Sequence, residues 1–131
     1  MKGLLDTHLL LWALYEPAKL PGRAVPLIES NANSIWFSAA SIWEIAIKAA
    51  LGRPDFAVRP REARAEALRI GLRELVIDGA QAAAVADLPR LHNDPFDRLL
   101  IVQARATHLT LFTSDRAVAA YGDGITLFPP D

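Results

Sequence analysis

Five acidic side chains lie near points where a predicted strand ends or a predicted helix begins, namely Asp6, Glu44, Asp94, Asp97 and Asp115. Carboxylate oxygens are hard ligands, and the chain has no cysteine and no paired histidines. Such a donor set selects Mg²⁺ or Mn²⁺ over softer metals. One or two of these ions can orient water and neutralise charge on a phosphodiester, so the chemistry to consider is metal-assisted hydrolysis.

Each of these acids also has a purely structural explanation. Asp6 is a good N-cap for the helix that follows it, and Ser41-x-x-Glu44 matches a capping box. Asp94-Pro95 matches an N-cap followed by proline at the first helical position, with Asp97 in the first turn. Asp115 suits the positive end of a helix dipole. Taken one at a time, the acids are explained at least as well by helix capping as by chemistry.

The elements that would position these acids alternate along the chain. The short, fully apolar run at residues 3–5 predicts a strand buried on both faces of a parallel sheet. Apolar segments, most of them rich in β-branched or aromatic residues, predict further strands at residues 34–38, 74–77, 109–113 and 125–128. Helical patterns fall between them, at about residues 7–15, 24–30, 41–51, 62–71, 80–87, 98–107 and 115–121. This alternation predicts an α/β fold with a mostly parallel sheet of four to five strands and helices on both faces.

The predicted topology brings the acids together. Asp6 and Asp115 follow strands directly, and Glu44 lies in the first predicted turn after the second strand, so all three belong to the carboxyl edge of the sheet. The helix 98–107 must run antiparallel to the next strand, which places Asp94 and Asp97 at the same edge. Ligands of open α/β sheets bind at that edge. We therefore expect one carboxylate cluster rather than scattered caps.

Several neighbouring side chains are candidate accessories to that cluster. Thr7, Thr113 and Ser114 supply hydroxyls beside the acids, and the same groups could serve as helix caps. Arg98 could pair with an acid or contact phosphate, and the sequence does not separate these roles. His92 could contact a substrate, but a lone histidine before a helix is more often a loop or capping residue, and it is interpreted as one. Lys48 stands four residues after Glu44, where an intrahelical ion pair is expected.

Composition sets outer bounds on the protein. The chain has 131 residues, 52% of them hydrophobic, which predicts a single domain over residues 1–131 with a real core. No apolar run is long enough for a membrane span, and no signal peptide is expected, so a cytoplasmic protein is predicted. The net charge of −1 gives no general attraction for nucleic acid. The three tryptophans lie in apolar patterns and are interpreted as core or interface residues, not as base-stacking platforms.

Five stretches of the sequence resemble a known family. They are Leu5-Asp6-Thr7-His8, Ser41-Ile42-Trp43-Glu44-Ile45-Ala46-Ile47-Lys48, Leu51-Gly52-Arg53, His92-x-Asp94-Pro95-Phe96-Asp97-Arg98-Leu99-Leu100-Ile101 and Thr113-Ser114-Asp115. In order and spacing the chain resembles PIN-domain proteins, and within them the VapC-type toxins of bacterial toxin–antitoxin pairs. The family's acidic positions fall on Asp6, Glu44, Asp97 and Asp115, whereas Asp94 belongs to the subfamily string.

The resemblance implies a three-layer α/β/α sandwich and a Mg²⁺- or Mn²⁺-dependent endoribonuclease that cleaves single-stranded RNA. It also implies a homodimer inhibited by a small cognate VapB-type antitoxin. Two other classes of function remain open from the residues alone. The same carboxylates would serve a metal-dependent phosphatase or DNA nuclease, and a non-catalytic PIN-fold interaction protein would keep the acids only as caps.

Overall fold

A computed structural model describes residues 1–131, and its centre is a five-stranded sheet in the order β3-β2-β1-β4-β5 with every pair parallel. The strands are β1 (Lys2–Leu5), β2 (Ser34–Ser38), β3 (Arg73–Leu75), β4 (Thr110–Thr113) and β5 (Ile125–Leu127). The chain winds from β1 outward to β3 and then returns to the other side of β1 for β4 and β5. This reversal places the carboxyl ends of β1 and β4 at the topological switch point, where α/β sheets leave a crevice.

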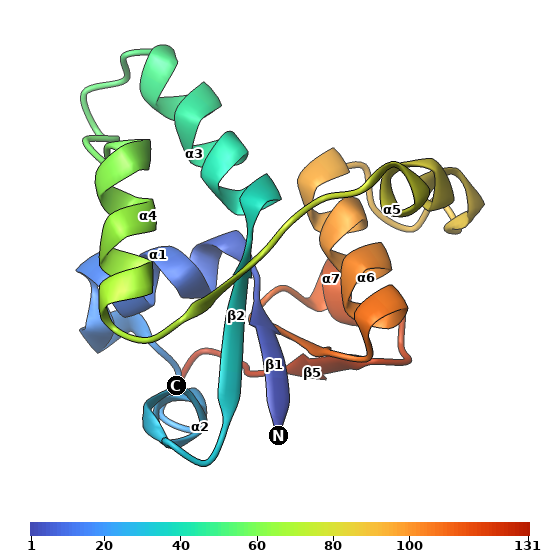
Figure 1. The fold of residues 1–131 in the computed structure, drawn as a ribbon, viewed down its shortest axis with the longest axis horizontal. Helices are drawn as coiled ribbons and strands as arrows, with labels where there is room; N and C mark the ends of the chain where they lie inside the picture. The colour runs from blue at the N-terminus through green and yellow to red at the C-terminus, as the bar shows by residue number, and fades with distance from the viewer.

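The helices cover both faces of the sheet (Figure 1). They are α1 (Thr7–Tyr15), α2 (Ala24–Glu29), α3 (Ala39–Ala50), α4 (Pro60–Arg69), α5 (Gly79–Ala84), α6 (Pro95–Thr107) and α7 (Arg116–Ala119), with short 3-10 helices at Pro17–Lys19 and Val85–Asp87. In Figure 1, α1, α2 and α4 lie to the left of the sheet and α5 and α6 to the right, while α3 continues beyond the end of β2. The three-layer α/β/α sandwich and the parallel sheet are confirmed.

The core has two halves because β1 is buried on both faces. Leu5 belongs to the half that packs under α1, and its neighbour Leu4 belongs to the half that packs under α6. Alternate side chains of a strand point to opposite faces, so a continuous apolar run is what a central strand requires. Gly3 is needed for a different reason, since a Cβ atom there would lie 2.7 Å from the ring of Phe112.

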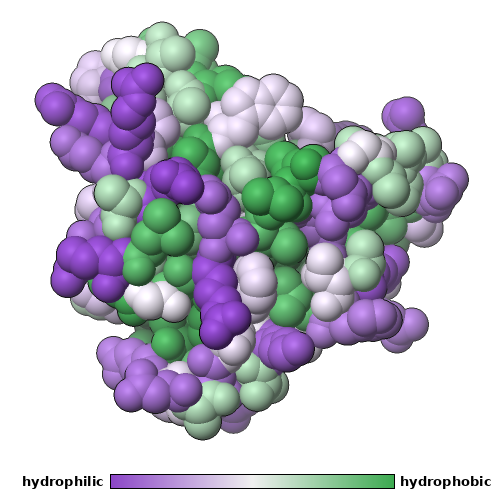
Figure 2. Space-filling view, viewed as in Figure 1, coloured by the Kyte–Doolittle hydropathy of each residue, from purple (hydrophilic) through white to green (hydrophobic).

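Most predicted elements lie within a few residues of the observed ones, and two differences matter for the site. Helix α3 begins at Ala39 with Ser38 as its N-cap, not at Ser41. Helix α6 begins at Pro95, three residues before the predicted start. Figure 2 shows the same side of the molecule as Figure 1. Apolar side chains gather there in the region where the extended segment between β3 and α5 crosses the sheet. None of the helices has the length and apolar character needed to cross a membrane.

Candidate metal centre at the carboxyl edge of the sheet

Asp6 forms the floor of the site. It ends β1 and caps α1, and its side chain is almost completely buried. One carboxylate oxygen accepts from the backbone N–H of Leu9 at 2.8 Å and the other accepts from the hydroxyl of Thr113 at 2.6 Å. Burial, with a smaller contribution from the nearby charge of Asp97, raises the pKa of Asp6 to about 6 in spite of these bonds. A buried carboxylate with a raised pKa is a common feature of functional sites.

The first turn of α6 brings two more acids to the floor. Asp94 is the N-cap, and its Oδ1 accepts from the backbone N–H groups of Phe96 at 2.8 Å and Asp97 at 3.2 Å. This confirms the predicted cap before Pro95. Asp97 is half-buried, and burial raises the pKa of its carboxyl group, with the charges of Asp94 and Glu44 adding to the effect. The acids of this edge therefore interact electrostatically, as a cluster must.

His92 joins this cluster, although the sequence interpretation favoured a loop or capping role over a contact with a substrate. Its Nε2 lies 2.9 Å from Asp97 Oδ2. Ligand atoms of His92, Asp94 and Asp97 all lie within 4.8 Å of one another, the spacing that a bound metal ion needs. The spacing His-x-Asp-x-x-Asp around a proline-started helix was the signal in the sequence that could have indicated this contact. The imidazole either orients Asp97 or serves as a ligand itself.

Glu44 reaches the edge from α3, but not by the predicted route. The helix begins at Ala39, so Glu44 lies in its second turn, and Ser41 lies inside the helix and cannot cap it. The expected capping box is therefore wrong, which removes the structural explanation for Glu44. The side chain is only 7% exposed, and it pairs with Lys48 at 3.0 Å, as the four-residue spacing predicted. Its charge contributes to the raised pKa of Asp97.

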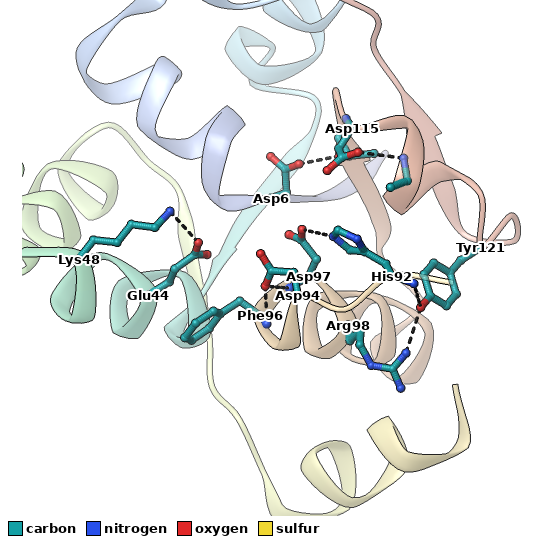
Figure 3. A network of polar contacts seen from close by, with 12 residues as sticks. Asp6, Glu44, Lys48, His92, Asp94, Phe96, Asp97, Arg98, Asp115 and Tyr121 are labelled. Atoms are coloured by element: carbon teal, nitrogen blue, oxygen red, sulfur yellow. Dashed lines mark hydrogen bonds and ion pairs between the residues drawn. The ribbon is translucent and has the colours of Figure 1, made fainter. Parts of the chain in front are cut away.

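Asp115 closes the site on the side of α7. It caps that short helix by accepting from the backbone N–H of Ala117 at 2.8 Å. The Thr113 hydroxyl accepts from the Asp115 N–H at 3.0 Å and donates to Asp6, so one buried threonine joins the ends of β1 and β4. Figure 3 shows Asp6 and Asp115 on one side of the site and Asp94, Asp97 and Glu44 on the other.

The other candidate accessories take different roles. Thr7 donates to the buried hydroxyl of Ser41 at 2.9 Å, which ties α1 to α3. The Ser114 hydroxyl oxygen is buried without a hydrogen-bond partner. Arg98 makes no ion pair with an acid. Its guanidinium instead donates to the carbonyls of residues 85, 88 and 89 and to the Tyr121 hydroxyl, which also accepts from the His92 N–H. Arg98 therefore braces the loop that presents His92.

A buried hydrogen bond also fixes the two helices that carry the outer acids. The Ser38 hydroxyl caps α3 and donates to the side-chain oxygen of Gln103 in α6 at 2.5 Å. The Gln103 amide in turn donates to the Val76 carbonyl and to Gln81. Ser38 and Gln103 are fully buried, so breaking this bond would leave unpaired polar groups in the core. The positions of Glu44 and Asp97 are thereby coupled.

The donor set fits a hard divalent cation. All five acids offer oxygen, and Glu44, Asp94, Asp97 and Asp115 each keep one carboxylate oxygen without a hydrogen-bond partner. Of the four acids assigned to the metal from sequence, only Asp97 lies in the tight group with His92 and Asp94. Asp6, Glu44 and Asp115 surround that group. Burial is the main cause of the raised pKa of Asp97, and a cation would offset the repulsion by Asp94 and Glu44 that adds to it.

The expectation that the tryptophans are core or interface residues divides at this edge. Trp43 precedes Glu44 in α3 and is 58% exposed, so of the two alternatives it is not a core residue. Its ring contacts Phe96 edge to face, with centroids 5.2 Å apart. Trp12 and Trp36 are half-buried and pack against the two halves of the core.

The fold and the site define a parallel α/β protein with an acidic centre at the switch point of its sheet. The sequence matches the PIN domain family over residues 3–124, and the chain belongs to that family. No curated protein matches the sequence.

Three solved structures share the fold. The VapBC2 complex of Rickettsia felis, bound to a DNA fragment from its promoter, matches with a TM-score of 0.65 and 18% identity over 100% of both chains. The FitAB complex bound to the IR36 DNA fragment matches with a TM-score of 0.61 and 20% identity over 98% of this chain and 94% of the other. A domain of a functionally unknown protein from Methanocaldococcus jannaschii matches with a TM-score of 0.59 and 18% identity over 99% and 92%.

Proposed function

We propose that this protein is a Mg²⁺- or Mn²⁺-dependent endonuclease that hydrolyses phosphodiester bonds in single-stranded RNA. The observation that carries the proposal is the convergence of buried Asp6 with Asp97, Asp94 and Glu44 at the switch point of the sheet. PIN domains are generally nucleases, and the chain belongs to that family. Burial raises the pKa of Asp6 to about 6, and strongly perturbed carboxylates of this kind are common at functional sites.

The chain's own residues would act by holding and orienting. Asp6, Glu44, Asp97 and Asp115 would hold the metal, with Asp94 and His92 at its margin. When bound, the ion supplies an activated water and neutralises charge on the phosphate. The Leu9 N–H and the Thr113 hydroxyl fix the carboxylate of Asp6, and His92 fixes that of Asp97. The backbone N–H groups at the start of α1 and α6 favour negative phosphate oxygens nearby.

The deciding experiment uses purified protein with single-stranded RNA and DNA of one sequence, in Mg²⁺, in Mn²⁺ and in EDTA. We expect RNA cleavage with either metal and none in EDTA. Cleavage of DNA alone would move the assignment to a DNA nuclease. Release of phosphate from a monoester without strand cleavage would indicate a phosphatase. A folded protein that cleaves neither polymer would support a non-catalytic interaction protein.

We propose further that the protein is the toxin of a VapBC-type pair, acts as a homodimer and is inhibited by a small cognate antitoxin. The support is the fold shared with the VapBC2 and FitAB complexes. An acidic centre suits an inhibitor segment that brings a basic side chain to the carboxylates. Co-expression with the neighbouring reading frame should give a stable complex with suppressed cleavage. Recovery of the free protein from that co-expression would contradict this assignment.

A further inference from the structure

The loop that carries His92 is held in place by very few groups. Its residues 88–94 form neither helix nor strand. The hydrogen bonds that residues 89–93 make to the rest of the protein end on only three side chains, those of Asp97, Arg98 and Tyr121. Asp97 belongs to the acidic centre itself. Arg98 and Tyr121 are therefore the hydrogen-bonding partners that hold the loop against that centre.

The hydroxyl group of Tyr121 is the point that these bonds share. It donates to the Pro89 carbonyl at 2.8 Å, and it accepts from the backbone N–H of His92 at 3.1 Å and from the Arg98 guanidinium at 3.0 Å. These bonds use the one proton and both lone pairs of the hydroxyl group. Figure 3 shows His92 between Tyr121 and Asp97, with its ring directed at the carboxylate.

Tyr121 is itself fixed at the other end of its side chain. Its ring is half-buried and packs against the half of the core that lies under α6. The Arg105 guanidinium, also on α6, donates to the Tyr121 carbonyl at 3.0 Å and to the Asp123 carbonyl at 3.1 Å. The hydroxyl group therefore extends from a well-anchored residue to the loop.

Helix α6 contributes to both sides of this arrangement. Asp97 and Arg98 are neighbours in its first turns, and successive side chains of a helix point about 100° apart. Asp97 therefore faces the acids while Arg98 faces the loop and the Tyr121 hydroxyl. The loop is held by the same helix whose carboxylate its histidine contacts.

We propose that Tyr121 is a positioning residue for the metal centre, because its hydroxyl group sets the place of His92 and His92 orients the carboxylate of Asp97. The proposal rests on the proposed function and adds to it a residue that none of the five resembling stretches contains. The distance from His92 Nε2 to Asp97 Oδ2 is 2.9 Å, so a shift of the loop by about 1 Å would break the contact. Groups that orient a metal ligand contribute to metal affinity without touching the ion.

A brace that only stabilises the fold is the competing explanation. Tyr121 would then contribute to the free energy of unfolding and leave the metal centre unchanged. The partners of its hydroxyl favour the positioning role. Two of them, Pro89 and His92, belong to the loop that contacts Asp97, and the third, Arg98, directly follows Asp97.

The test compares Tyr121→Phe, which deletes only the hydroxyl group, with Thr107→Val. The Thr107 hydroxyl donates to the Gln103 carbonyl at 2.7 Å at the far end of α6, so this control also loses one hydroxyl group. Calorimetric titration with Mn²⁺ in the absence of RNA measures metal affinity. We expect Tyr121→Phe to weaken Mn²⁺ binding about 10-fold, the lower end of the effect of groups that orient ligands. Thr107→Val should bind Mn²⁺ like wild type. Thermal melts in EDTA check that both variants fold.

A double-mutant cycle shows whether Tyr121 acts through His92. His92→Ala removes the imidazole and keeps the backbone N–H that bonds to Tyr121. Adding Tyr121→Phe to His92→Ala should weaken Mn²⁺ binding no further, whereas a merely structural role would give the same additional loss in both backgrounds. Amide hydrogen exchange in EDTA supplies a check without metal. Exchange at the His92 amide should become faster in Tyr121→Phe and stay unchanged in Thr107→Val.

Three results would overturn the positioning role. They are wild-type Mn²⁺ affinity in Tyr121→Phe, an equal loss of affinity in Thr107→Val, and additive losses in the double variant. If the wild-type protein binds Mn²⁺ and cleaves RNA while Tyr121→Phe is unaffected, the role of Tyr121 fails alone. If the wild-type protein neither binds Mn²⁺ nor cleaves RNA, the proposed function fails and the positioning role fails with it.

Discussion

The carboxyl end of the sheet gathers acidic side chains and the amino end does not. The volumes of the hollows at the two ends do not predict this difference. Two hollows lie at the amino end, of about 540 and 660 Å³, and the first is lined by apolar residues such as Leu20, Ile28 and Leu72, with Glu29 and Arg73 as its charged residues. The hollows at the carboxyl end that border the acids are smaller, about 410 and 490 Å³. Five carboxylates meet at that end. The site proposed for the chemistry is therefore marked by the convergence of charge and not by the size of the cavity.

The difference arises from the backbone. At the carboxyl end of a parallel sheet each strand leads into a helix N-terminus, whose unpaired N–H groups donate to the carboxylate of an acidic cap. Asp6, Asp94 and Asp115 are all N-caps in this structure. Asp94 and Asp115 each hold their helix with one carboxylate oxygen and keep the other free, whereas the second oxygen of Asp6 accepts from Thr113. Capping a helix therefore does not exclude a role at the proposed metal centre, although the sequence interpretation treated the two as alternatives.

The largest expected effect is on RNA cleavage, and it should distinguish a substitution at the carboxyl end of the sheet from one at the amino end. Asp97→Asn should lower RNA cleavage by at least about 100-fold, because it removes a charge from the centre of the cluster while keeping the side chain's shape. Glu29→Gln makes the same chemical change at the amino end and should leave cleavage unchanged. Gel assays of both proteins, with circular dichroism as a fold check, measure the difference. Equal activities would place the chemistry elsewhere.

Metal binding should distinguish the ends without a substrate. A cation that binds only the folded protein stabilises it by about 2.7 kcal/mol at a hundred times its dissociation constant. The melting temperature of wild type and of Glu29→Gln should rise by several degrees on adding Mg²⁺ or Mn²⁺ in place of EDTA. Asp97→Asn should start slightly higher in EDTA, because less charge is repelled, and should shift less. A wild-type melting temperature that changes with neither metal would contradict the proposed metal centre.

A pH series isolates the buried floor of the site. Asp6 has a folded-state pKa of about 6 against an ordinary 3.8, so in EDTA the folded protein keeps a proton that the unfolded chain has lost. The free energy of unfolding therefore falls as pH rises from about 4 to about 6, by on the order of 3 kcal/mol from this group. The Asp6→Asn variant should not lose this stability as the pH rises, and its amide side chain should still cap α1.

Urea unfolding in EDTA at pH 4 and pH 8 checks this expectation. The variant should be more stable than wild type at pH 8 and no more stable at pH 4. A variant less stable than wild type at pH 8 would mean that the two hydrogen bonds to the Asp6 carboxylate outweigh its burial.

The smallest expected effect concerns Asp94. Serine caps a helix about as well as aspartate, so Asp94→Ser should keep the start of α6 and most of the stability. If the acid is mainly a cap, activity should fall by less than about tenfold, well below the effect of Asp97→Asn. Complete loss in a folded protein would make Asp94 part of the chemistry and would give weight to its group with His92 and Asp97.

The fold was predictable because the hydrophobic pattern along the chain identifies strands and helices locally. Their alternating order then fixes a parallel sheet with helices on both faces. The run at residues 3–5 predicted a strand buried on both faces, and β1 is one. The helix starts were less secure, since Ser38 and Ser41 are both good caps and only packing selects between them. That error shifted Glu44 by a turn and supplied it with a capping role that it does not have.

Two features of the site lay outside the reach of the sequence. The contact between His92 and Asp97 depends on the path of the loop before α6, which Arg98 and Tyr121 set through carbonyl and hydroxyl bonds. The exposure of Trp43 depends on where α3 ends its contact with the sheet. Neither is a property of spacing along the chain, because both follow from how separate elements pack.

The central place of β1 has a consequence for how the protein is made. Gly3 pairs with Thr110, and Asp6 bonds to Thr113 across 107 positions of the chain. Parallel pairings of such long range form late in folding, after a large loop-closure entropy has been paid. A nascent chain that has not yet emerged to Asp115 therefore holds its acids on separate, unjoined segments. The completed charge cluster can arise only when nearly all of the 131 residues have been translated.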